Sequence, residues 1–556
     1  MNPINHDDDI FNIASYLNKQ AHDHPHLRAV ICPMSEDKHG RMAYTHLTFQ
    51  QLDQESDCYA HGLERAGIKR GVRTILMVTP GLDFFCLVFA LFKVGAVPVV
   101  VDPGMGITRM LRCLQEGRPK AFIGVSQAHV LRKLAPGFFK NVNIWVTVGK
   151  RWFWGGLTLK QLRVTPWKPF PVASTRRDEI AAILFTTGST GPAKGAVYTH
   201  GIFDAQIRQI SQHWGITPGE IDLPTFPLFA LFDPALGMTA VIPKMDPTRP
   251  AHVDPENIIK PIMDQGVTNM FASPALLNRV GRYGREKGIK LPTLKRVISA
   301  GAPVSPVNIE TFSTMLTGEA EIHTPYGATE AVPTVSITSN EILSETRAMT
   351  EKGFGMCVGR SMEGIDVKII QITDDPIPEW SDDLILPVGE IGEITARGDL
   401  VSRKYFERAE ADALAKIKDG DRIWHRMGDV GWLDDKGRIW FCGRKSQRVI
   451  TAQGNLFTIP CEAIFNNHPR VFRSALVGLG PRGHQKPVMI IELEESDDGS
   501  NMEGLIGELS AMARANERTK NIETILIHKS FPVDIRHNAK IFREKLAVWA
   551  EDQLKK

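Results

Sequence analysis

The stretch over residues 185–195 constrains this 556-residue chain more than any other. It follows the apolar run 181–185, so we expect a loop that leaves the end of a buried strand. Glycines let backbone N–H groups turn towards an anion, hydroxyls donate hydrogen bonds, and a lysine adds positive charge. The residues that supply these groups are Thr186, Thr187, Gly188, Ser189, Thr190, Gly191 and Lys194.

This composition predicts a loop that binds a polyphosphate. The pattern is not a Walker A loop, because Ala193 stands where the second glycine of that motif belongs. A flexible surface turn is the alternative, but a turn needs only one or two glycines and gains nothing from the hydroxyls and the lysine.

Length and composition exclude several protein classes. A chain of 556 residues with 43% hydrophobic content can bury a large core in more than one domain. A net charge of +3 gives no indication of nucleic acid as a partner. The seven cysteines contain no CxxC pair, which predicts reduced thiols in a cytoplasm and argues against a disulfide framework or a zinc site.

Hydropathy predicts neither a signal peptide nor a membrane span. The first nine residues carry three aspartates and no apolar core. The longest apolar run, 84–92, is much shorter than the ~20 residues of a spanning helix and is expected to form a buried helix.

The first part of the chain alternates between strand and helix patterns. Thr48 and Gln51 form a sequence typical of a capping box and predict the start of a helix. A further helix is expected over 84–93, and strands are expected over 72–78, 97–101, 121–125 and 144–148. This alternation predicts parallel sheets covered by helices.

The segment between Glu116 and Asp178 contains no acidic residue and twelve Lys or Arg. Aromatic residues are interleaved with these charges, namely Trp145, Trp152, Phe153, Trp154 and Trp167. A basic and aromatic surface could meet a membrane or an acidic protein. The alternative is that the charges are spread over several faces of a folded region.

The phosphate-loop sequence resembles that of the acyl-adenylate-forming superfamily, the AMP-binding enzymes similar to acyl-CoA synthetases. Further motifs of that family follow in the same order: Gly301-Ala302-Pro303, Tyr326-Gly327-Ala328-Thr329-Glu330, the segment ending at Asp429, Gly443-Arg444, and Lys540. The resemblance covers nearly the whole chain.

The resemblance implies a role for each motif. ATP would lie on the loop and on the segments 301–303 and 326–329, with Asp429 on the ribose hydroxyls and Arg444 reaching the nucleotide. Glu330 would hold Mg2+, and Thr329 and Lys540 would contact the α-phosphate. A carboxylate is already ionised at neutral pH, so its attack on that phosphate needs no general base.

The fold that the resemblance implies combines α/β and α+β domains. An N-terminal adenylation domain, residues 1–442, would contain packed α/β subdomains and a β-rich part. A small mobile α+β domain, residues 443–556, would carry Lys540, and the active site would lie between the two.

Two departures from the ligase pattern bear on the second reaction step. Ala230 replaces the histidine that lies near the thiol's approach in acyl-CoA synthetases. The hinge reads Lys445-Ser446-Gln447-Arg448, without the usual acidic residue, and the following glycine, Gly454, comes one residue later than in the thioester-forming loop. Both weaken the case for a thiol acceptor.

The hinge and the segments 459–463 and 534–540 are most similar to the olefin β-lactone synthetases. This resemblance implies adenylation of a long-chain 2-alkyl-3-hydroxy acid, whose own 3-hydroxyl then displaces AMP. Other enzymes of olefin biosynthesis would be partners, in the cytoplasm or in a membrane-associated assembly.

The alternatives are a long-chain acyl-CoA or acyl-carrier ligase and a nucleotide-binding scaffold without turnover. His200, His323 and His425 are conceivable bases for the hydroxyl, and the sequence favours none of them.

Overall fold

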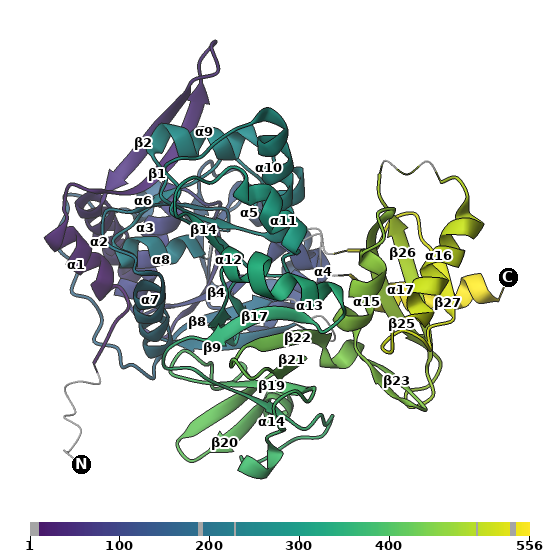
Figure 1. The fold of residues 1–556 in the computed structure, drawn as a ribbon. Coiled ribbons are helices and arrows are strands. Elements are labelled where there is room, and N and C mark those ends of the chain that lie inside the picture. The colour runs from purple at the N-terminus through teal and green to yellow at the C-terminus, as the bar shows by residue number, and fades with distance from the viewer. Residues whose placement is uncertain are drawn as a thin grey trace.

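The computed structural model describes residues 10–186, 193–226, 229–495, 497, 499–533 and 541–555. Figure 1 shows a large body built from the N-terminal and central parts of the chain, with a smaller unit beside it that contains the C-terminal helix α17 (Arg543–Leu554). The fold is a mixed α/β multidomain arrangement.

The first sheet contains strand β8, which precedes the predicted phosphate-binding loop. Its order is β7-β6-β5-β3-β4-β8-β9, and its pairs are parallel except the antiparallel pair β8–β9. The strands are β3 (Arg73–Met77), β4 (Val97–Val101), β5 (Ala121–Val125), β6 (Ile144–Val148), β7 (Leu157–Thr158), β8 (Ile180–Thr186) and β9 (Lys194–Thr199). The predicted strands are confirmed, and only β3 is shorter than expected, by one residue at each end.

The second sheet has the order β14-β13-β12-β10-β11-β1-β2 and is parallel except for the pair β1–β2. Its strands are β1 (Arg28–Glu36), β2 (Met42–Thr48), β10 (Ile221–Pro224), β11 (Thr239–Val241), β12 (Asn269–Ala272), β13 (Arg296–Ser299) and β14 (Glu321–His323).

Helices cover these two sheets, as the alternation predicts. They are α1 (Ser15–Asp23), α2 (Phe49–Arg65), α3 (Leu82–Lys93), α4 (Ile107–Glu116), α5 (Ser126–Leu134), α6 (Leu159–Leu162), α7 (His200–Trp214), α8 (Phe232–Leu236), α9 (Glu256–Gln265), α10 (Pro274–Lys287), α11 (Pro306–Ser313), α12 (Ser339–Glu341) and α13 (Arg347–Glu351). The capping box is confirmed, because the Thr48 side chain accepts from the Gln51 N–H and the Gln51 side chain accepts from the Thr48 N–H.

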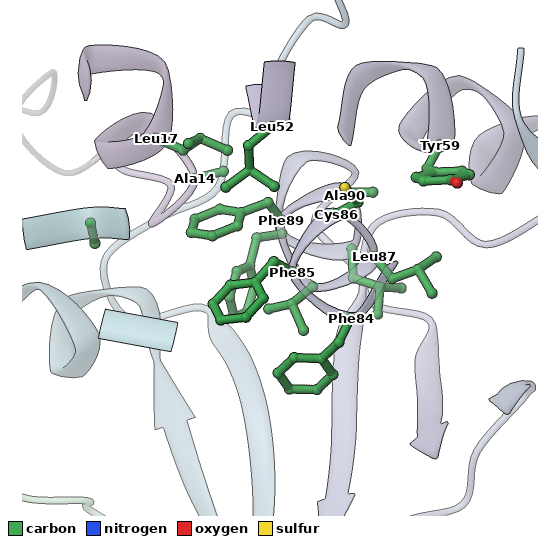
Figure 2. Packing of buried hydrophobic residues seen from close by; sticks show 14 of the residues in the cluster. Ala14, Leu17, Leu52, Tyr59, Phe84, Phe85, Cys86, Leu87, Phe89 and Ala90 are labelled. Atoms are coloured by element: carbon green, nitrogen blue, oxygen red, sulfur yellow. The ribbon is translucent and has the colours of Figure 1, made fainter. Parts of the chain in front are cut away.

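Helix α3 is buried from Phe84 to Lys93, as predicted from its continuous apolar run. Figure 2 shows its side chains Phe84, Phe85 and Phe89 in one cluster with Leu17 of α1 and Leu52 of α2. Among the described residues, no helix is long and apolar enough to cross a membrane.

An antiparallel sheet follows, which is the β-rich part expected before the hinge. Its order is β15-β16-β17-β22-β21-β19-β18, with β20 paired to β21 and α14 (Ala409–Ala415) leading into β20. The strands are β15 (Tyr326–Ala328), β16 (Ala331–Ser336), β17 (Met356–Ser361), β18 (Asp366–Ile370), β19 (Gly392–Arg397), β20 (Lys416–Asp419), β21 (Arg422–Leu433) and β22 (Ile439–Arg444).

The C-terminal unit has apolar clusters of its own, one around Phe465 and Leu509 and one around Phe531 and Leu546. The β23–β24 hairpin precedes a sheet of order β25-β26-β27. The elements are β23 (Val449–Thr451), β24 (Gly454–Leu456), α15 (Thr458–Asn466), β25 (Val471–Leu479), β26 (Lys486–Leu493), α16 (Met502–Arg514), β27 (Thr524–Ile527) and α17.

The basic and aromatic segment is divided by the fold. Trp154 is buried and stacks on His129 with ring centroids 5.3 Å apart, and Trp145 lies under the Arg132 guanidinium at 3.8 Å. Trp152, Phe153 and Trp167 are exposed by 51%, 78% and 45%. Several cations pair with carboxylates, in Arg118–Glu407, Arg163–Glu55, Arg176–Asp178 and Arg177–Asp204. The charges therefore lie on several faces, while Lys150 and Arg151 remain beside the exposed pair Trp152 and Phe153.

Candidate active site

A cavity of about 620 Å³ lies where the two parallel sheets meet the antiparallel sheet. Its walls come from strands β4 and β8, from helices α3, α7 and α8, and from the segments 300–301, 327–330 and 425–428. Lys445 and Ser446 of the hinge also line it. One end is polar and the other is apolar, which suits a charged nucleotide joined to an acyl chain.

The predicted phosphate-binding loop follows the end of strand β8, as expected, and the next strand, β9, pairs with β8. Thr186 is the last residue of β8, and its Cα partner across the antiparallel pair is Lys194, the first residue of β9. Lys194 lines the cavity. The predicted loop residues Thr187, Gly188, Ser189, Thr190 and Gly191 lie outside the described residues, as does Lys540.

At the polar end, Asp429 is held by two side chains. The Tyr326 hydroxyl donates to Asp429 Oδ2 over 2.6 Å, and Arg444 Nη1 lies 2.9 Å from Asp429 Oδ1. Burial and the Asp429 carboxylate raise the pKa of Tyr326, while the Asp429 charge raises the pKa of Arg444. Three residues predicted from separate motifs therefore meet at one carboxylate.

The remaining predicted nucleotide contacts lie close by. Gly301, Gly327, Ala328, Thr329 and Arg444 line the cavity. Tyr326 and Asp429 stand directly beside the lining residues Gly327 and Gly428, and Ala302 and Pro303 follow Gly301 in the loop after β13.

Glu330 is the centre of a second polar cluster. The Tyr405 hydroxyl donates to Glu330 Oε1 over 2.5 Å, and the Nζ atoms of Lys194 and Lys416 lie 5.0 and 5.3 Å from the centroid of the Tyr405 ring. Burial acts to raise the pKa of Glu330, but Lys416 and the Tyr405 hydrogen bond help to hold the pKa below its usual value. Glu330 is therefore ionised at neutral pH.

Lys416 and His425 belong to the same cluster and are Cα partners in the β20–β21 pair. Lys416 is buried and donates to the Ser402 carbonyl. Burial lowers the pKa of Lys416 to about 8, and burial together with the Lys416 charge lowers the pKa of His425 to about 3. Neutral His425 lines the cavity as a weak base.

The other two histidines named from the sequence lie elsewhere. His200 accepts from the Ile13 N–H and is buried, which lowers its pKa to about 4. Burial also lowers the pKa of His323 to about 4. Among the described residues, neither one lines the cavity.

Ion pairs connect the hinge to strand β19 and to the segment that follows β18. Glu393 is fully buried and binds Arg426 Nη2 at 2.7 Å and Lys445 Nζ at 3.0 Å. Arg448 reaches Asp374 at 2.8 Å. The unusual hinge residues therefore take part in charge pairing at the edge of the cavity.

Aromatic side chains form the apolar end. Phe229 stacks on Phe271 with centroids 4.3 Å apart, and Phe226, Leu231 and Phe232 also line the wall. Leu228 of the same segment lies outside the described residues. Ala230, which replaces the ligase histidine, is buried.

Helix α3 extends the apolar wall. Phe84, Val88, Phe89 and Phe92 line the cavity on this side. The apolar run 84–92 of the sequence predicts that these residues are buried, but it does not indicate that they line a cavity.

The model of the AMP-binding enzyme family matches residues 17–406. The chain belongs to this family. It is 48% identical over 553 residues, 98% of this chain and 99% of the relative, to an olefin beta-lactone synthetase of Stenotrophomonas maltophilia (strain K279a). It is 46% identical over 549 residues, 98% of each chain, to an olefin beta-lactone synthetase of Xanthomonas campestris pv. campestris.

More distant similarity extends to ligases. A long-chain fatty acid–CoA ligase of Mycobacterium tuberculosis is 24% identical over 486 residues, 84% of this chain and 86% of the ligase. O-succinylbenzoate coenzyme A synthetase of Bacillus subtilis, solved with ATP and magnesium ion, superimposes with a TM-score of 0.74 at 19% identity, covering 96% of this chain and 98% of that one. This likeness confirms the predicted adenylating-enzyme fold.

Proposed function

We propose that this AMP-forming ligase adenylates a long-chain 2-alkyl-3-hydroxy acid and closes it to a β-lactone, releasing AMP and pyrophosphate. The observation that carries the proposal is the cavity that joins the Glu330 cluster to an aromatic wall. Near-complete coverage of two olefin beta-lactone synthetases at 46% and 48% identity supports the same reaction.

The first step activates the acid. A carboxylate oxygen attacks the α-phosphorus of ATP, and the bond to the leaving pyrophosphate breaks. Lys194 and Lys540 would offset the charge of the phosphates, Thr329 would donate to the α-phosphate, and Asp429 would hold the ribose hydroxyls. The segments 186–191 and 301–303, with Tyr326, Gly327, Ala328 and Arg444, would complete the ATP site.

Glu330 fits the role of a Mg2+ ligand. Its carboxylate is ionised and lines the cavity, and the described residues contain no cluster of three His, Cys, Asp or Glu that would hold a metal alone. Mg2+ typically uses one or two carboxylates together with phosphate oxygens. When bound, it would neutralise charge on the ATP phosphates.

The second step needs no second substrate. The 3-hydroxyl oxygen attacks the acyl carbon of the adenylate, the bond from that carbon to AMP breaks, and the hydroxyl proton is released. An internal nucleophile gains from proximity, because no thiol has to enter the site. Ala230 and the paired hinge residue Lys445 agree with a reaction that does not admit coenzyme A.

The same proposal assigns a different role to each of the two domains. Residues 1–442 would form the adenylation domain, and residues 443–556 a mobile domain that brings Lys540 to the cavity. The hinge would lie directly after Arg444, the last residue of β22.

The exposed loop residues 150–153 are the proposed contact with larger partners. Lys150 and Arg151 directly precede the exposed Trp152 and Phe153. Arg151 donates to the Gly156 carbonyl, and neither cation forms a salt bridge within the described part of the chain. We propose that the protein works in the cytoplasm within a membrane-associated assembly of olefin-biosynthesis enzymes. Unchanged association of a Lys150→Glu/Arg151→Glu variant with membranes and with these enzymes would refute this contact.

Release of pyrophosphate tests the proposed activity. Purified protein with ATP, Mg2+ and a long-chain 2-alkyl-3-hydroxy acid should release AMP and pyrophosphate over many turnovers without coenzyme A. A ligase would stop after one adenylate per site until coenzyme A is added, and a scaffold would release nothing.

A further inference from the structure

Gln206 of α7 lines the cavity and carries a buried acceptor without a partner among the described residues. The residue is 2% exposed and lines the cavity together with Phe203 and Ile207 of the same helix. Its Nε2 donates to the Val332 carbonyl over 2.7 Å, which fixes the orientation of the amide. Among the described residues, Oε1 has no hydrogen-bond partner.

Other polar side chains along this wall are already engaged. The Thr225 hydroxyl donates to the Phe271 carbonyl over 2.7 Å, and the Tyr198 hydroxyl donates to the Thr329 carbonyl. A buried acceptor without a donor is costly, and such groups in cavities commonly meet a ligand. We therefore expect a ligand in the cavity to donate a hydrogen bond to Gln206 Oε1.

The position of Gln206 restricts that donor to a place near the reacting carboxyl group. Its amide is bonded to Val332, three residues after Thr329 and two after Glu330. Phe203 and Ile207 of the same helix are apolar and also line the cavity. Gln206 is thus linked through Val332 to the strand that follows Glu330, and its neighbours on α7 are apolar lining residues.

We infer that Gln206 Oε1 accepts a hydrogen bond from the 3-hydroxyl of the acyl substrate and so selects hydroxy acids. The inference rests on the proposed function. The acyl part of a 2-alkyl-3-hydroxy acid carries one O–H donor, and two carbon atoms, C2 and C3, separate its oxygen from the carboxyl carbon. The amide orients the hydroxyl oxygen towards the acyl carbon but takes no proton, because an amide is not basic.

The test compares two acids that differ only in the 3-hydroxyl. The rate of pyrophosphate release in the first turnover is measured as a function of acid concentration, with a 2-alkyl-3-hydroxy acid and with the corresponding 2-alkyl acid, because an acid without the 3-hydroxyl stops at the adenylate. Wild-type protein should prefer the hydroxy acid by about tenfold or more, since loss of a donor leaves the site's acceptor unpaired. Gln206→Met, which keeps the side-chain length, should lose this preference by slowing the hydroxy acid alone.

Gln20→Met is the matched control. Gln20 is also buried, its Oε1 also lacks a partner among the described residues, and it lies on α1 away from the cavity. This variant should keep the wild-type preference. If Gln206→Met does not fold, Gln206→Asn withdraws the acceptor by one methylene and should show the same loss.

The ratio of the rates with the two acids distinguishes the role of Gln206 from the proposal of lactone synthesis. An unchanged ratio in Gln206→Met would overturn the role of Gln206, even if lactone forms. A wild-type enzyme that prefers the hydroxy acid but makes no lactone would refute lactone synthesis and leave the hydroxyl contact standing.

Discussion

The hydroxyl of Tyr405 donates to Oε1 of Glu330 over 2.5 Å, although the two residues are 75 positions apart in the chain. This hydrogen bond orients the carboxylate that we assign to Mg2+. A hydrogen bond to a metal ligand commonly fixes the ligand's orientation and changes the affinity of the site for the metal.

Tyr405→Phe should slow adenylation about tenfold and raise the Mg2+ concentration needed for half-maximal rate. The variant removes a charge-assisted hydrogen bond and keeps the ring against Lys194. The measurement is the rate of pyrophosphate release as a function of Mg2+. Tyr283→Phe is the control, because it removes a 2.6 Å hydrogen bond to Glu256 away from the cavity. Equal behaviour of the two variants would contradict the role of Tyr405.

The lowered pKa of Lys416 predicts that the rate of adenylation falls at alkaline pH, which gives the pH profile an alkaline limb. Its pKa is lowered by burial to about 8, so it is charged below that pH and neutral above it. Glu330 loses a neighbouring positive charge as pH rises through 8, and adenylation should fall. His425, with a pKa of about 3, stays neutral throughout and adds no limb.

Lys416→Arg should abolish this limb, because an arginine stays charged at every pH of the assay. The measurement is pyrophosphate release from pH 6 to 10. Lys418→Arg, on the exposed side of the same strand, should keep the wild-type profile. A limb that persists in Lys416→Arg would assign the titration to another group.

Lys540→Ala should reduce adenylation by at least a hundredfold while the protein remains folded. The expectation rests on the family resemblance and on the charge that develops at the α-phosphate. Pyrophosphate release and thermal unfolding are measured together, with the exposed Lys529→Ala as control. Near-normal adenylation by the Lys540 variant would overturn its assignment.

Phe85→Ala should destabilise the protein by about 3–5 kcal/mol, because it removes a fully buried ring from the cluster around α3. The change in free energy of unfolding is measured by urea denaturation. Phe153→Ala is the control, since a ring that is 78% exposed should contribute less than about 0.5 kcal/mol. Equal losses would contradict the burial of α3.

The sequence predicts what depends on local patterns. Strands β4, β5 and β6 have the expected bounds because each apolar run is short and bounded by turn or helix signals. Tyr326, Asp429 and Arg444 are found because each stands in a motif, and the fold brings them together.

Tyr405, Lys416 and Gln206 show what the sequence does not predict. Each lies on an ordinary strand, helix or loop, and its role depends on neighbours that are distant in the chain. Lys416 and His425 become neighbours only through pairing of β20 with β21. Gln206 is distinguished by an oxygen without a partner, a property that exists only after folding.

Mass spectrometry of the products tests the central claim most directly. Purified protein, ATP, Mg2+ and a long-chain 2-alkyl-3-hydroxy acid are incubated with and without coenzyme A. Formation of AMP and of a product lighter than the acid by one water, without coenzyme A, is the predicted result. An adenylate that persists until coenzyme A converts it to a thioester would contradict lactone synthesis and identify a ligase.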